Sequence, residues 1–160
     1  MRYLTLSELI YINGKLLNNA QIMSGKQKVR DVTLLQAAVA RPSASAFGAD
    51  AYPTLREKIA SLFHSVVRNH PFTDGNKRTA AVAALFMGEV NGECLTWQPE
   101  AALSIILSAA EGRYALEKLA AWFTFAPCAP FPDANADEDM RTIARIIEDQ
   151  RWLLDELAKQ

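Results

Sequence analysis

The sequence has few cysteines and no long hydrophobic run. Its two cysteines, Cys94 and Cys128, are too few for a disulfide framework and lack a CxxC spacing, which argues against metal-finger and thioredoxin-like proteins. The longest apolar stretches, 80–87 and 101–110, are shorter than the roughly 18 to 20 residues that cross a bilayer. The first eight residues show no export signal. We therefore expect a soluble, cytoplasmic protein in a reducing compartment, with no membrane partner.

The sequence also lacks an excess of one charge. Lys and Arg total 17 against 18 Asp and Glu, a net charge of −1. A protein that neutralises many nucleic-acid phosphates needs a broad basic surplus, so no nucleic-acid partner is expected. Half of the 160 residues are hydrophobic, which is enough for a globular domain to bury its own core.

Apolar residues recur mostly at spacings of three and four, and no run alternates as a strand would. We therefore predict an all-α fold. The segment 41–52 is expected to be a loop, and the helix over 75–92, apolar nearly all round at 80–87, is expected to be the buried centre. Capping residues and prolines predict core helices over these ranges: 5–17, 31–40, 53–69, 75–92, 99–111 and 115–125.

Composition changes after residue 125. Three prolines between 126 and 136 predict a stiff linker, which separates a core domain of residues 1–125 from a tail. The tail, 137–160, is predicted to be an amphipathic helix, and residues 133–160 carry twice as many acidic as basic side chains. Its apolar stripe consists of Met140, Ile143, Ile147, Leu154 and Leu157, interrupted by Gln150.

This apolar stripe needs a partner surface. We expect it to pack on the core or on a second copy of the chain, which would give a homodimer through the C-terminal helix. An alternative is autoinhibition, in which the acidic tail lies on a basic pocket of the core.

The stretch 68–78, RNHPFTDGNKR, carries the chemistry. Free N–H groups at a helix N-terminus form an anion pocket, and Gly75 lets a ligand approach the main chain. Lys77 and Arg78 in the first turn suit a bound phosphate better than an empty helix end. The residues therefore predict a phosphate-binding helix start.

Three neighbouring side chains complete the predicted site. Asp74 would repel phosphate unless a cation sat between them, and Mg²⁺ meets that need. His70 can accept a proton from a hydroxyl near neutral pH, which indicates phosphoryl or nucleotidyl transfer. Asn76 is expected to hold the turn or touch a phosphate, and Phe72 to turn inward and anchor the loop.

This stretch resembles the Fic/Doc family signature HxFx(D/E)GNxR, which joins two helices of an all-α bundle and binds a nucleotide triphosphate. The resemblance covers residues 1–125 and leaves the tail uncovered. It extends along the Doc (death on curing) branch through the following segments in the same order: Val29-Arg30-Asp31, Leu34-Leu35, Ala40-Arg41-Pro42, Phe47-Gly48 and Tyr52-Pro53-Thr54-Leu55.

Two positions depart from the adenylylating Fic pattern. Lys77 stands where those enzymes have glycine, and Ala81 where they have a second arginine. Both match the Doc branch, in which the lysine fills the space of the α-phosphate, ATP binds reversed and its γ-phosphate is transferred to a hydroxyl. The resemblance implies a protein kinase with ATP and Mg²⁺ as cofactors. The residues that it assigns are His70 as base, Asp74 as Mg²⁺ ligand, and Arg68, Gly75, Asn76, Lys77 and Arg78 as nucleotide or phosphate contacts.

The same resemblance implies a protein substrate of the translation-factor class, elongation factor Tu, with arrest of translation and a small antitoxin that neutralises the toxin. Two alternatives stay open: a Fic-type adenylyltransferase, and a non-catalytic nucleotide- or partner-binding module of the same fold. Elsewhere, His64 is expected to be structural. Lys26, Lys28 and Arg30 are expected to form a solvated loop that could contact a protein target.

Overall fold

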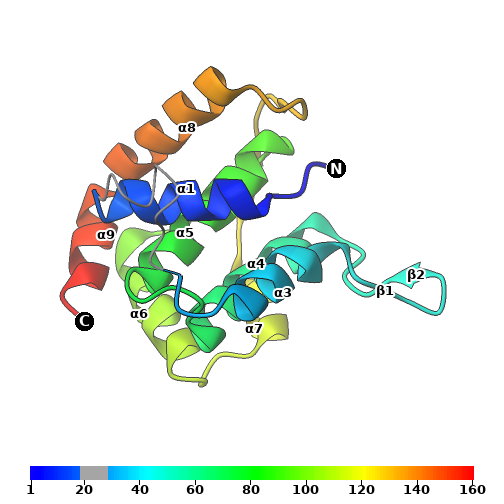
Figure 1. Ribbon diagram of the computed structural model, residues 1–160, viewed down its shortest axis with the longest axis horizontal. Helices are drawn as coiled ribbons and strands as arrows, with labels where there is room; N and C mark the ends of the chain where they lie inside the picture. The colour runs from blue at the N-terminus through cyan, green and yellow to red at the C-terminus, as the bar shows by residue number, and fades with distance from the viewer. Residues whose placement is uncertain (19–28) are drawn as a thin grey trace.

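One helix lies in the middle of the fold, with other helices around it. The computed structural model describes residues 1–18 and 29–160. Over these residues the chain is mostly helical, as predicted (Figure 1). The described elements, in chain order, are α1 (Leu6–Leu16), α3 (Val32–Ala40), the 3-10 helix η1 (Arg41–Ser43), β1 (Ser45–Ala46), β2 (Ala49–Asp50), α4 (Leu55–Asn69), α5 (Asn76–Val90), β3 (Glu93–Leu95), α6 (Pro99–Ala110), α7 (Leu116–Trp122), β4 (Phe125–Pro127), α8 (Ala136–Asp149) and α9 (Arg151–Ala158).

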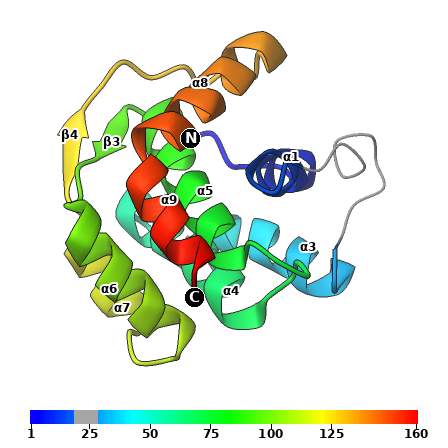
Figure 2. The ribbon, with the colours of Figure 1, turned by 90° about the vertical axis from the view of Figure 1, so that its left-hand side faces the viewer.

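The central helix is α5, which packs against α1, α4, α6, α8 and α9 (Figure 2). Its middle is buried on every side, from Thr79 to Gly88. Four alanines in this stretch keep the helix thin, so that neighbouring backbones approach it closely, while Phe86 and Met87 fill the space further along. The prediction of a buried central helix is confirmed.

Side-chain caps set the starts of three helices where the sequence placed them. Thr5 accepts a hydrogen bond from Glu8 N at 3.2 Å. Asp31 does the same for Leu34 N at 3.0 Å, and Thr54 for Glu57 N at 3.2 Å. Each cap pairs a donor that the first turn leaves without a partner inside the helix.

The segment 41–52, predicted as a loop, contains η1 and a β-hairpin. Strands β1 and β2 pair antiparallel, and the hairpin projects away from the helices (Figure 1). Phe47 at its tip is fully exposed and has a positive φ of 55°. The prediction missed the hairpin because two-residue strands are too short to show an alternating pattern.

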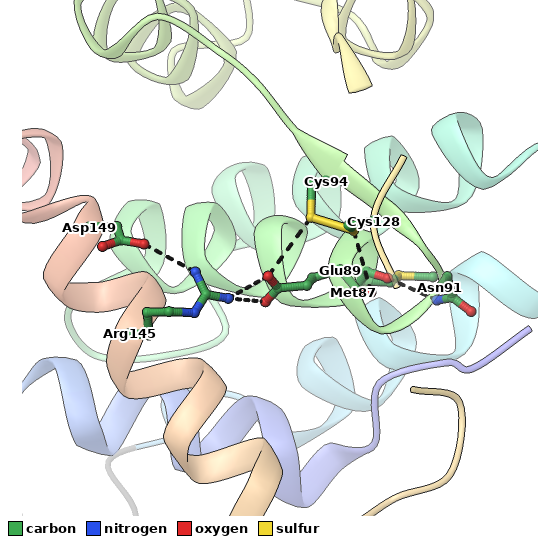
Figure 3. Close-up of a disulfide and its surroundings, with 7 residues drawn as sticks. All are labelled: Met87, Glu89, Asn91, Cys94, Cys128, Arg145 and Asp149. Carbon is green, nitrogen blue, oxygen red and sulfur yellow. Dashed lines mark hydrogen bonds and ion pairs between the residues drawn. A yellow bond between two sulfur atoms is a disulfide. The ribbon is translucent and has the colours of Figure 1, made fainter. Parts of the chain in front are cut away.

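A second ribbon pairs β3 with β4, and a disulfide closes it (Figure 3). Cys94 lies in β3 and Cys128 directly follows β4, with their Cα atoms 5.9 Å apart. Sequence reasoning did not find this disulfide, because strand pairing joins two cysteines 34 positions apart that no local spacing connects. β4 also shortens the predicted helix over 115–125 and occupies the start of the predicted linker. Since disulfides are rare in the cytosol, the cytoplasmic location stays a prediction.

The tail forms two helices rather than one. The helix is interrupted at Gln150, whose side chain accepts a hydrogen bond from the Trp97 indole N–H at 3.2 Å. α8 packs on α5, and α9 packs on α5 and α6. The side chains buried by this packing are Ile143, Ile146, Ile147, Leu153, Leu154 and Leu157.

Two ion pairs fix α8 to the core. Arg2, 7% exposed, donates to both carboxylate oxygens of Asp139 at 3.1 and 2.7 Å. Arg145 pairs with Glu89 at the end of α5 (Figure 3). Packing of the tail on the core, one of the two expected arrangements, is therefore what the structure shows, and the homodimer stays a prediction. Among the described helices, none has the length and hydropathy of a membrane span.

Candidate active site

The residues of the predicted site lie in and beside the short loop between α4 and α5: Arg68 is in the last turn of α4, and Asn76, Lys77 and Arg78 are in the first turn of α5. α4 ends at Asn69, and His70 caps it in the left-handed conformation, at φ 49° and ψ 60°. Gly75, at φ 76°, turns the chain into α5. A non-glycine residue rarely adopts positive φ, so the loop holds His70 in a backbone conformation that needs support from its surroundings.

Phe72 and Asn76 fasten the loop to the core. Phe72 is 1% exposed. The Asn76 side chain accepts from Phe72 N and donates to Phe72 O, both at 3.0 Å. The observed contacts of the Asn76 amide are thus within the loop, and its predicted phosphate contact stays a prediction.

Gly75 brings the main chain close to α1. A Cβ at this position would lie 3.2 Å from both Asn13 Nδ2 and Leu17 Cδ2, and positive φ would add strain. The N–H groups of the first turn of α5 have no acceptor within the helix and carry partial positive charge. The start of α5 therefore has the geometry of an anion-binding cradle, which we define as the main chain of residues 75–78.

Asp74 stands at the edge of this cradle with 73% of its side chain exposed. Its Oδ1 accepts from Gly75 N at 2.8 Å and lies 3.7 Å from the Arg78 guanidinium. In the described part of the chain, no group of three or more His, Cys, Asp or Glu side chains could hold a metal ion. One exposed carboxylate beside the predicted phosphate site fits Mg²⁺, which protein sites bind through one or two carboxylates plus phosphates and water.

Two basic side chains follow in the first turn of α5. Lys77 and Arg78 are both half-buried. Arg78 lies beside a small hollow that the cradle shares with the last residues of the tail, Leu157, Ala158 and Gln160. The end of α9 therefore adjoins the site, and the alternative of a tail that acts on the site stays a prediction.

His70 is exposed at the point where α4 ends and the loop begins. Partial desolvation lowers the pKa of His70 below its usual value. The positive charges of Lys77, Arg30 and Arg68, in that order, lower it further. The imidazole is consequently neutral at neutral pH, which is the state in which it can accept a proton.

The side chain of Arg68 points to another helix end. Its Nη1 donates to Ala110 O at 2.7 Å, at the C-terminus of α6. A Cβ at Gly112 would come within 3.0 Å of the guanidinium, so glycine makes room for it there. This contact suits a cation at the negative end of a helix. The predicted contact of Arg68 with phosphate is not among those observed and stays a prediction.

Sequence reasoning missed Asn13 on α1, which is fully buried. Its Nδ2 donates to Asp74 O at 2.9 Å and to Thr79 Oγ1 at 3.0 Å, so α1 holds the main chain of the loop and the first turn of α5 together. A polar residue four positions after the buried Leu9, on the apolar face of the helix, was the available signal.

Sequence reasoning also assigned Arg30 to a solvated loop. Arg30 is exposed, as expected, but its guanidinium donates to the carbonyls of Asn69 and His70. Lys26 and Lys28, assigned to the same loop, lie outside the described residues. His64, expected to be structural, lies on α4, and its Nδ1 is 3.3 Å from the Arg41 guanidinium of η1.

The chain is similar to known proteins. A model of the Fic/DOC family matches residues 3–87, slightly more than half of the chain, and the match includes the whole loop. Over 68 residues the chain is 56% identical to a protein of Mycolicibacterium smegmatis named Toxin Doc. That alignment covers 42% of this chain and 52% of the relative, so the chain spans about half the length of the curated relative that it matches.

Proposed function

Because the chain belongs to the Fic/DOC family, we propose that it is a protein kinase that transfers the γ-phosphate of ATP to a serine or threonine hydroxyl of another protein. The observation that carries this proposal is the place of Lys77. Its side chain is half-buried in the first turn of α5, and after desolvation its positive charge lowers the pKa of His70.

The position of Lys77 supports binding of ATP in the orientation opposite to that in adenylylating relatives. We take the Lys77 side chain to fill the space that a glycine would leave open for an α-phosphate, as the resemblance to the Doc branch implies. A terminal phosphate is then the group closest to His70. Ala81, which stands where adenylylating relatives have an arginine, is fully buried in α5 and offers no charge to a phosphate chain.

The residues of the loop supply the parts of the reaction. His70 takes the proton from the acceptor hydroxyl, whose oxygen forms a bond to the γ-phosphorus. The bond from this phosphorus to the bridging oxygen breaks, and ADP leaves. Lys77, Arg78 and the N–H groups of the cradle stabilise the charge on the phosphate oxygens. Asp74 would hold Mg²⁺, which when bound neutralises phosphate charge.

The biological role that we propose is that of a toxin, from the name of the M. smegmatis relative. We propose a translation factor, elongation factor Tu, as the protein substrate, and a small antitoxin as the partner that blocks the activity. Phosphorylation of such a factor would arrest translation.

Label transfer tests the proposed reaction. The protein is incubated with bacterial lysate and with ATP labelled on either the α- or the γ-phosphate, and the labelled band is identified. We expect label from the γ-phosphate only, lost in His70→Ala and retained in the matched control His64→Gln. Label from the α-phosphate would make the protein an adenylyltransferase. Nucleotide binding without any transfer would make it a non-catalytic module.

A further inference from the structure

The segment before α3 lies directly against the site loop. Val29 forms an antiparallel bridge with Phe72. The main-chain N–H groups of Arg30 and Asp31 both donate to Pro71 O, at 2.8 and 3.1 Å. The bridge at Val29 and the two main-chain hydrogen bonds to Pro71 O thus tie residues 29–31 to the loop that carries His70.

The side chain of Arg30 contacts the main chain of His70 and of the residue before it. Its Nε donates to His70 O at 2.6 Å, and its Nη2 donates to Asn69 O at 2.7 Å. These carbonyls end α4, where helix carbonyls lack partners and carry partial negative charge. The planar guanidinium therefore joins the last helical residue to the first residue of the loop in a fixed geometry.

We propose that Arg30 is a positioning residue for His70, whose two-pronged contact holds the imidazole in line with the acceptor hydroxyl. The inference rests on the proposed function, because it takes His70 as the base. His70 needs such support: it adopts positive φ at the end of α4, and its side chain is exposed rather than packed in the core. A lysine at position 30 would keep the charge but lose the fork.

The charge of Arg30 has a second consequence at the same place. The groups whose charges act on His70 are Lys77 from α5, Arg68 from α4 and Arg30 itself, and all three are positive. Their common effect is to keep the imidazole neutral. The effect of the two hydrogen bonds and the effect of the charge can be separated experimentally. Lysine at position 30 retains the charge but not the planar guanidinium, and glutamine retains neither.

The test uses Arg30→Lys and Arg30→Gln in the full chain, with Arg141→Gln on the exposed side of α8 as control. We measure kcat and KM for ATP in label transfer. We expect kcat to fall about ten- to a hundredfold in both variants while KM changes little, because misplacing a catalytic group affects the reaction more than binding. Wild-type kcat in Arg30→Lys would overturn the proposal.

An NMR titration of the imidazole is the readout that does not depend on activity. The chain has only two histidines, so His64→Gln assigns the His70 resonance. We expect altered His70 and Phe72 amide shifts in both variants, and a raised His70 pKa in Arg30→Gln alone. Unchanged His70 and Phe72 resonances would overturn the proposal even if the wild-type protein transferred no label, a result that would separately refute the kinase.

Discussion

Asn76 and Phe72 exchange two hydrogen bonds across the site loop, each 3.0 Å long. The side-chain amide of Asn76 thereby pairs both the N–H and the C=O of a buried main-chain residue. Because an unpaired buried polar group is costly, this pair holds the loop in one conformation. The cradle at the start of α5 and the position of His70 both depend on that conformation.

Replacing Asn76 with alanine should therefore destabilise the protein. It leaves two buried main-chain groups of Phe72 without partners, at a cost of about 1–3 kcal/mol for each. Urea unfolding measures the free energy of unfolding, and we expect it to fall together with label transfer. A variant with wild-type stability would show that water or a rearranged loop pairs these groups equally well.

His70→Ala should abolish transfer and leave nucleotide affinity nearly unchanged. A general base contributes about 10²- to 10⁴-fold to the rate and little to ground-state binding. Calorimetric titration with ATP and single-turnover transfer give the two quantities for the same sample. A loss of affinity as large as the loss of rate would instead identify His70 as a ligand contact.

The rate of transfer should depend on the protonation of His70. Its pKa is lowered by desolvation and by the neighbouring positive charges, so the neutral form persists to a pH below the usual range for histidine. We expect kcat/KM to be constant at neutral pH and to fall as the pH drops through this lowered pKa. An acid limb with its midpoint above about 6.5, the unperturbed histidine value, would contradict the assignment.

Asp74→Ala should remove the dependence on Mg²⁺ along with the activity, because the carboxylate and the phosphates share the ion. The measurement is transfer against Mg²⁺ concentration. Asp133→Ala changes an exposed carboxylate outside the loop and serves as control. Full activity in Asp74→Ala would refute the metal role.

Cys94→Ser should lower stability and spare activity. The disulfide closes a 34-residue span, for which chain entropy predicts about 3–4 kcal/mol. β3 follows the far end of α5, about 20 Å from the site loop for a 15-residue helix. A dithiol reductant should destabilise the wild type by a similar amount and leave Cys94→Ser unchanged. Equal unfolding curves for the wild type with and without reductant would contradict this expectation.

Local signals in the sequence were sufficient for most of the core helices and for the position of the site loop. Thr5, Asp31 and Thr54 cap helices through contacts within three residues, and such patterns are visible in one dimension. The alanine-rich middle of α5 is apolar nearly all round, and this pattern predicted its burial. The residues 70–78 are contiguous, so the predicted site is a single stretch of chain and not an assembly of distant parts.

The support of the loop comes from distant segments, and sequence reasoning missed it. Asn13 and Arg30 contact residues 39 to 66 positions away. The polar side chain of Asn13 on the apolar face of α1 is a signal, but it does not indicate which residues it contacts. The Cys94–Cys128 disulfide likewise depends on the β3–β4 pairing. The helix break at Gln150 lets α9 turn onto α6. The two helices are far apart in the sequence, so no local pattern indicates this packing.

The mass that the acceptor gains tests the central claim most directly. Purified elongation factor Tu, or the acceptor found by labelling, is incubated with the protein and Mg²⁺-ATP and then analysed by intact-mass and peptide mass spectrometry. The account predicts an increment of one phosphoryl group on a serine or threonine, absent with His70→Ala. An increment of one adenylyl group on that residue would contradict it.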